Sequence, residues 1–338
     1  MKYLRSFAVM GMGLVLSVTL VACSPGGRTL DDTSSSQSSA SSASPNLDQE
    51  QVERILSSVQ EVIDQAESEN DSELLAVRLA NPALSMRQGQ MERAELTGED
   101  LEDLTLSLKV FSSTVEDAWP RTLVVGTKAS GDTPAVIYVF TQSDAQSDYM
   151  LENWVRLIGG NSVTGLSVQS GSRSLSYDAT GYLRTPSETL AIFINLLNDP
   201  ENEEYQIFND STVSVRVSEE LAALNDALES VGEVTLEATV ADYPLTAVTL
   251  TSGEALVSGG FTYTNVYQRT AANSVMEVGG TAASYLDDPS VVGTVTVTYT
   301  VNVLFTVPAE ASGQETINVV GAERVIQSVE SDDSTSPD

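Results

Sequence analysis

Histidine is absent from this chain of 338 residues, and cysteine occurs once, as Cys23. Without imidazole there can be no Ser-His-Asp or Cys-His pair and no histidine-ligated zinc site. A single cysteine leaves no disulfide to form within the chain. Beyond residue 22 the only lysines are Lys109 and Lys128. Catalysis would have to use carboxylate, hydroxyl, tyrosine or lysine groups, and no catalytic motif built on them is present. We therefore expect a protein that is not an enzyme.

Positive charge is scarce as well. The sequence has 16 Lys and Arg residues against 48 Asp and Glu residues, for a net charge of −32. Such a surface repels nucleic acid, because affinity for nucleic acid comes from neutralising phosphates, so we expect no nucleic-acid partner. Residues 187–330 hold three basic and 21 acidic residues, which concentrates arginine in the first half. Those arginines either neutralise nearby carboxylates or form an anion-binding face.

The first 23 residues have the three-part pattern of a secretory leader. Two basic residues precede an uncharged apolar run over residues 7–20, which is shorter than the ~20 residues that a spanning helix needs. The LVAC that follows at residues 20–23 resembles the lipobox of bacterial lipoproteins. This resemblance implies cleavage of the signal peptide 1–22, lipidation of Cys23 with thioether-linked lipid and acyl chains such as palmitate, and a position on the outer face of the cytoplasmic membrane. The alternative is an ordinary signal peptide with an incidental cysteine.

Polar segments flank the predicted folded part. Residues 23–46 are rich in serine with almost no large apolar side chain, and residues 331–338 are short, polar and acidic. Neither segment can bury enough apolar surface to offset the entropy lost on ordering. We expect a disordered tether that begins at the lipidated cysteine, and a disordered acidic tail.

Between these flanks, helical patterns followed by β-runs occur twice. Apolar spacing predicts helices over residues 47–70 and 71–96, with an interruption at Asn81-Pro82, and four short strands follow. The second helical block opens at Thr185-Pro186-Ser187-Glu188, where a capping residue, a proline and a capping glutamate occur in sequence. A further helix is predicted over residues 219–231.

The β-runs that follow include residues 294–307, which are almost entirely β-formers and long enough for a curved central strand. We expect an α+β fold of two domains, residues 47–184 and 185–330, each with helices packed on a curved antiparallel sheet. This layout looks like the cystatin-like or nuclear-transport-factor-two-like superfold. The alternative is one α+β domain followed by a β-sandwich.

Several short motifs occur in order along the chain: RLANPALSMR at 78–87, AWPR at 118–121, WVRLI at 154–158, DATG at 178–181 and the helix start at 185–186. Together they resemble a family of uncharacterised actinobacterial surface lipoproteins, over roughly residues 75–330 and most clearly over 75–200. The chain departs from the family pattern at Asn81, where glycine is usual, and at Gly159-Gly160, where Pro-Gly is usual. The family has no established activity, so the resemblance implies only the fold and the envelope location.

Six residues stand out as a ligand-binding or structural cluster of arginine and tryptophan: Arg78, Arg87, Trp119, Arg121, Trp154 and Arg156. Each tryptophan has an arginine two residues later, and side chains two apart on a strand share a face. Each pair could stack, either to recognise a ligand or to hold a sheet against a helix. The other two arginines suit a buried pair with a helix carboxylate or, alternatively, an anion site.

An acidic loop at residues 198–204 offers oxygen ligands for calcium, but it lacks the glycine and ligand alternation of an EF-hand. A solvated loop is the preferred interpretation, so we expect no metal and no cofactor. The sequence as a whole predicts a membrane-anchored extracytoplasmic lipoprotein that serves as a non-catalytic binding or envelope-assembly module. Its expected partners are the membrane lipid and an envelope protein. The alternative is a carboxylate- or tyrosine-based enzyme with a pocket in one domain.

Overall fold

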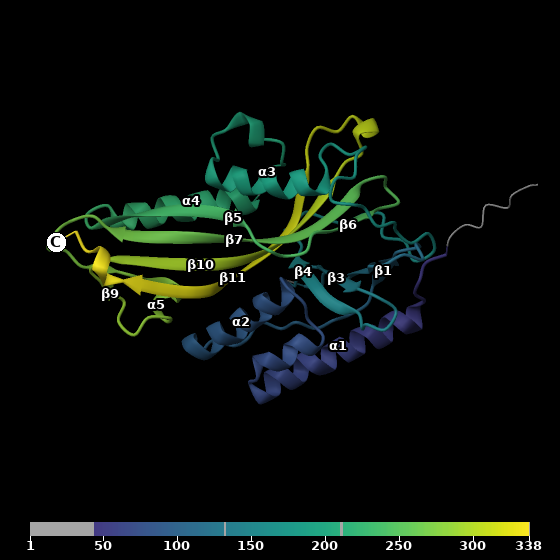
Figure 1. Ribbon diagram of the computed structural model, residues 1–338, viewed down its shortest axis with the longest axis horizontal. Helices are drawn as coiled ribbons and strands as arrows, with labels where there is room; N and C mark the ends of the chain where they lie inside the picture. The colour runs from purple at the N-terminus through teal and green to yellow at the C-terminus, as the bar shows by residue number, and fades with distance from the viewer. Residues whose placement is uncertain (1–43, 132, 210–211, 338) are drawn as a thin grey trace, which may run out of the picture. The chain divides into compact units, whose positions relative to one another are not determined.

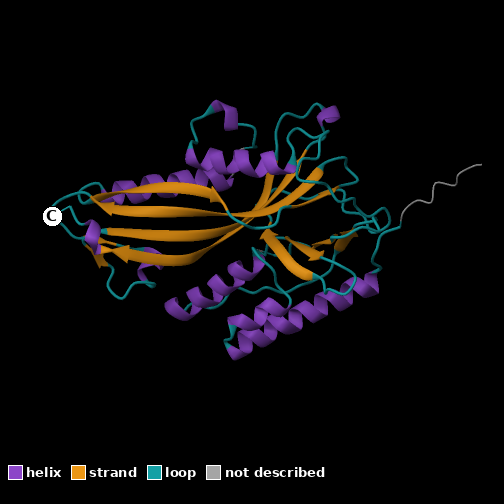
Figure 2. Ribbon diagram, in the orientation of Figure 1, coloured by secondary structure: helices purple, strands orange, loops and turns teal. Residues whose placement is uncertain are grey.

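The computed structural model describes residues 44–131, 133–209 and 212–337. The predicted signal peptide, Cys23 and the tether as far as residue 43 lie outside the described residues. Residues 43–338 form one compact unit. The predicted α+β class with antiparallel sheets is confirmed (Figures 1 and 2). The predicted division at residue 184 falls within this unit and stays a prediction.

The first half begins with three helical segments: α1 (Gln49–Glu69), the 3-10 helix η1 (Ser72–Val77) and α2 (Ala83–Thr97). Asp48 and Gln51 form a capping box that satisfies the first amides of α1. The apolar stripe predicted from the sequence faces inward, with Val52, Val59 and Ile63 fully buried. Pro82 directly precedes α2, which agrees with the interruption predicted there.

A short four-stranded sheet follows as an antiparallel meander. Its strands, in spatial order, are β1 (Val110–Ser113), β2 (Arg121–Gly126), β3 (Val136–Gln142) and β4 (Met150–Arg156). Leu123 and Val125 join the apolar cluster under α1 and α2, whereas Val124 between them joins a cluster on the opposite face. Both faces of this sheet are therefore buried, which explains why its strands read as continuous apolar runs.

The long sheet belongs to the second half. Its strand order is β11 (Asn318–Asp332), β10 (Thr294–Val307), β7 (Ala255–Arg269) and β5 (Gly232–Val240), and β6 (Thr246–Thr249) pairs with the far end of β7. The strand predicted over residues 294–307 is β10, with partners on both sides. The shorter elements are η2 (Glu203–Tyr205), β8 (Met276–Glu277), α5 (Gly280–Ala283), β9 (Ser290–Val291), η3 (Glu310–Ser312) and η4 (Asp333–Thr335).

Two helices, α3 (Pro186–Asn198) and α4 (Thr212–Leu228), lie along the long sheet (Figure 1). The predicted capping box at Thr185 and Glu188 is present at the start of α3. Phe193 of α3 makes edge-to-face contacts with Phe208, Phe261 and Phe305 at centroid distances of 5.2, 6.1 and 5.2 Å. This aromatic cluster fixes α3 on β7 and β10.

The two sheets pack against each other through a third apolar cluster. Residues of β2, β3 and β4 meet residues of β6, β7, β10 and β11 there, with Val124, Ile137 and Val155 opposite Leu304 and Val320 among others. Gly321 of β11 lets the strands approach, because a Cβ at this position would lie 2.7 Å from the carbonyl oxygen of Arg156.

Two predicted boundaries are corrected. The helix expected over residues 219–231 is α4 and begins at Thr212, because Val213 and Val217 extend its apolar stripe toward the N-terminus. Valines in this stretch resemble a strand in sequence, since β-branched residues favour strands. The tail expected to be disordered from residue 331 begins with two more residues of β11, which pair with β10, and then η4.

Candidate functional site

The predicted arginine and tryptophan residues do not form one site. Arg87 is fully buried and donates to the Glu67 carboxylate of α1 at 2.5 and 3.1 Å, and to the Gln90 side chain at 2.8 Å. Its guanidinium thus joins α1 to α2, which matches the buried pair with a helix carboxylate expected from the sequence. Arg78 instead pairs with Asp148 at 2.9 Å.

The two tryptophans have different surroundings. Arg121 lies over the ring of Trp119 at 4.1 Å from the centroid, so this pair stacks as expected. Trp154 is 1% exposed and packs in the core between the helices and the short sheet. Arg156, the last residue of β4, points away to carboxylates on other elements. The expected stacking is therefore wrong for this second pair.

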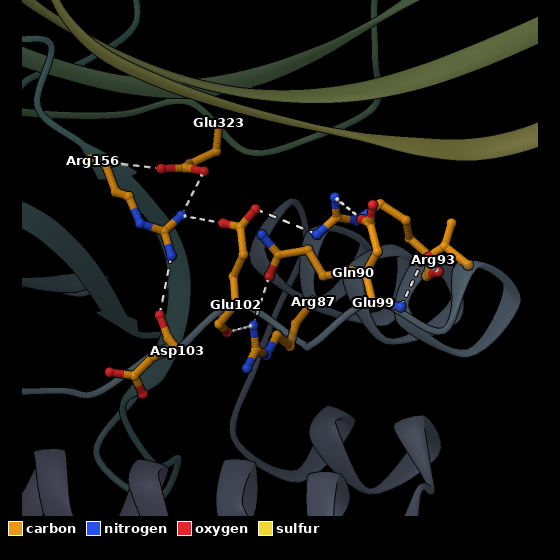
Figure 3. Close-up of polar contacts among 9 residues, drawn as sticks. Arg87, Gln90, Arg93, Glu99, Glu102, Asp103, Arg156 and Glu323 are labelled. Carbon is orange, nitrogen blue, oxygen red and sulfur yellow. Dashed lines mark hydrogen bonds and ion pairs between the residues drawn. The ribbon is translucent and has the colours of Figure 1, made fainter. Parts of the chain in front are cut away.

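Arg156 is the centre of an ion network that joins both halves of the chain (Figure 3). Its guanidinium pairs with Glu323 of β11 at 2.8 Å and with Glu102 at 3.1 Å. Its backbone N–H also donates to Glu323 at 2.9 Å. Glu102 pairs further with Arg93 of α2 at 3.4 Å. Burial raises the pKa of Glu323, although the positive charge of Arg156 opposes that shift.

Two cavities lie beside this network, against the edge strand β11. The larger, of about 550 Å³, is bounded by α2, α4 and the stretch around α5. The smaller, of about 410 Å³, lies between α4, the end of α3 and strands β7, β10 and β11. Three side chains line both cavities: Glu220, Glu323 and Arg324. Volumes of this size fall in the range typical of small-molecule sites.

Arg324 separates the two cavities. It donates to the Glu220 carboxylate of α4 at 2.7 Å and to the Tyr263 hydroxyl of β7 at 2.7 Å. Its guanidinium also lies 5.4 Å from the ring centroid of Tyr299, which stacks on Tyr263 at 4.6 Å. Burial raises the pKa of Tyr263 to about 12, so this hydroxyl stays protonated at neutral pH. Arg324 thus ties α4 to the sheet across the groove.

These groove residues were missed by the sequence reasoning. A signal was present, because residues 187–330 contain only three basic residues. Two of the three, Arg216 and Arg324, line the smaller cavity. Their convergence could not be inferred from the sequence, since it depends on how α4 lies over β11.

Glu152 is a second unusual carboxylate, at a junction of the two sheets. It is 6% exposed on β4 and accepts hydrogen bonds from Thr141 of β3, at 2.8 Å, and from Thr246 of β6. Burial raises the pKa of Glu152, and the two hydroxyl donors only partly oppose this. The residue does not line either cavity described above, and its two hydrogen bonds link β4 to β3 and to β6.

Metal binding has no support in the described part of the chain. Within residues 44–131, 133–209 and 212–337, no group of three or more Cys, Asp or Glu side chains is placed to hold an ion. The acidic loop at 198–204 contains η2, with Glu203 and Glu204 exposed. None of the described helices is long and apolar enough to cross a membrane.

Comparison with known proteins found no match among protein families, curated proteins or solved structures. The resemblance to actinobacterial surface lipoproteins therefore stays a prediction.

Glu152 generates a prediction about pH. Its pKa is raised on folding, so its contribution to the free energy of unfolding is largest below the ordinary value of 4.5 and is lost as the pH rises through the folded-state value. As the pH rises from 4 to 7, the free energy of unfolding of the wild type should fall relative to that of Glu152→Gln. The expected fall is about 1.4 kcal/mol for each unit by which folding raises the pKa. Urea denaturation at pH 4 and pH 7 measures this difference. Glu95→Gln, at an exposed position of α2, is the control. If the wild type and Glu152→Gln differ in free energy of unfolding by the same amount at pH 4 and at pH 7, the raised pKa of Glu152 is contradicted.

Proposed function

We propose that this chain is a lipid-anchored extracytoplasmic binding protein whose ligand occupies the groove between α4 and the long sheet. The observation that carries the proposal is the pair of adjoining cavities that share Arg324 and Glu323. The groove offers apolar walls, an aromatic stack and a small number of fixed polar groups, which is the usual composition of a ligand site. The protein then acts by contact at a defined position in the envelope.

The anchor in this proposal is supported by the leader pattern and by the single cysteine. Because Cys23 is the only cysteine, it has no disulfide partner within the chain. Two or more acyl chains hold a protein stably on a bilayer, where one chain does not. The tether between Cys23 and the first described contacts would hold the groove away from the lipid surface. Those contacts begin at Asn46, which binds Thr114 and Glu116.

We also propose that the two halves are related α+β modules of the cystatin-like kind. The support is the repeated association of helices with an antiparallel sheet. One apolar cluster joins α1 and α2 to the short sheet, and another joins α3 and α4 to the long sheet. The groove belongs mainly to the second module, and the first module borders its larger cavity through α2 and Glu102.

A carboxylate enzyme is the second candidate, and Glu323 is the observation that favours it. This side chain lines both cavities and burial raises its pKa, as in a general acid. Its two oxygens are, however, held by the guanidinium and the backbone amide of Arg156. Binding is preferred because such a carboxylate is already committed to a structural pair.

The anchor can be tested by Cys23→Ser. We expect the variant to incorporate no radiolabelled palmitate and to move from the detergent phase to the aqueous phase on phase separation, because it lacks the nucleophile for lipid attachment. Ser24→Ala should behave as the wild type. Retention of the label by Cys23→Ser would contradict the lipoprotein assignment.

The groove can be tested with full-length protein in mild detergent, incubated with an organic extract of the host envelope. Native mass spectrometry should detect at least one compound retained by the wild type and lost from Arg324→Gln, since this side chain borders both cavities. Arg54→Gln, at an exposed position of α1, should retain it. Circular dichroism establishes that each variant is folded. Retention of no compound, or equal retention by Arg324→Gln, would overturn the proposal.

A further inference from the structure

The smaller cavity differs from the larger one in its lining. Its walls are mostly apolar, with Leu197 of α3, Val217 of α4, Phe261 of β7 and Val301 of β10 among them. Four of its polar side chains, Glu220, Tyr263, Glu323 and Arg324, are already paired within the protein. A sugar or a nucleobase would therefore lose more hydrogen bonds to water than it would gain. An apolar chain loses none, and its burial is favourable.

Ion pairs account for three of the four charged side chains that line this cavity. Glu220 is paired with Arg324, and Glu323 is paired with Arg156. Arg216, on the exposed side of α4, also lines the cavity and has no carboxylate partner among the described residues. Arg121 and Arg184 also lack an ion pair among the described residues, but Arg216 differs from them in lining this apolar cavity. It leaves one positive charge at the edge of an apolar chamber.

We infer that the smaller cavity binds an amphipathic monoanion, a single acyl chain with a carboxylate or comparable anionic head. The chain would lie among the apolar walls, and the head would pair with Arg216. This inference rests on the proposed function and names its ligand class. A planar guanidinium suits a carboxylate, because its N–H groups match the two oxygens. A cationic or uncharged head would leave Arg216 without a partner.

The test uses residues 24–338, which contain the whole compact unit, with decanoate as the probe below its micellar concentration. Isothermal titration should give saturable binding of decanoate. Hexanoate, four methylenes shorter, should bind about 200-fold more weakly, since each buried methylene contributes about fourfold. Decan-1-ol should bind about tenfold more weakly than decanoate, because it lacks the charge. A short-chain glycerophospholipid, whose acyl chains are esterified, is titrated in the same way. It should bind more weakly than decanoate, the free acid.

Two variants with matched controls localise the binding. Arg216→Gln should weaken decanoate about tenfold and leave decan-1-ol unchanged, whereas Arg54→Gln should change neither. Ala322→Trp fills the cavity and should abolish binding of both probes, whereas Ala76→Trp, at an exposed position of η1, should have no effect. Circular dichroism and thermal unfolding check that the variants are folded.

The inference is overturned if decanoate fails to bind, if decan-1-ol binds as well as decanoate, or if Arg216→Gln and Ala322→Trp bind like the wild type. These outcomes are separable from failure of the proposed function. If decanoate fails but an envelope compound is retained in an Arg324-dependent manner, the groove binds a ligand of another class. If neither is bound, both proposals fall.

Discussion

The fold depends on one partly buried charge pair, Arg156 with Glu323, where β4 meets β11. Removing two charges from water is costly unless each finds good partners. Glu323 is only 11% exposed, and its oxygens accept from both the guanidinium and the backbone amide of Arg156. The remaining donors of Arg156 reach Glu102 and the backbone of Asp103. The pair therefore fixes the two strands relative to each other and also holds the segment after α2.

Because of this junction, β11 serves two surfaces at once. Successive side chains of a strand point to opposite faces. Arg324 and Ile326 border the larger cavity, and Val325 between them packs in the core cluster of α1 and α2 while also reaching that cavity. Glu323, which pairs with Arg156 where β4 meets β11, lines both cavities. The proposed binding groove is thus built on a strand whose position is set by the other half of the chain.

Arg324 plays the corresponding role inside the groove. It contacts α4, β7 and the ring of Tyr299 at the same time, through Glu220 and Tyr263. Without it, α4 would be held mainly by its apolar stripe, in which several residues are only half buried. The same side chain divides the groove into a polar and an apolar chamber. The same arginine therefore ties the helix to the sheet and borders both chambers of the proposed groove.

Local elements of the fold could be predicted from the sequence, whereas contacts between distant elements could not. The capping box at Thr185 and the long run of β-formers over 294–307 specify their structures through neighbouring residues alone. The start of α4 was missed because valine favours strands, and packing on the sheet overrides that preference.

The candidate site shows the same limit. Arg87 was identified as a buried pair, since helices offer carboxylates nearby, but its partner Glu67 was not named. Arg156 was assigned to Trp154 by proximity in sequence, whereas its partner is 167 residues away. With 48 acidic residues in the chain, sequence spacing carries no information about which carboxylate an arginine will meet.

The most direct test of this view is a double-mutant cycle on the pair that joins the sheets. Arg156→Met and Glu323→Gln should each lower the free energy of unfolding by about 3 kcal/mol, because each leaves the other group buried without its partner. The double variant should lose clearly less than the sum, with a coupling of at least about 1.5 kcal/mol. Effects that add within about 0.5 kcal/mol would show that the pair does not hold the sheets together, and would contradict the account.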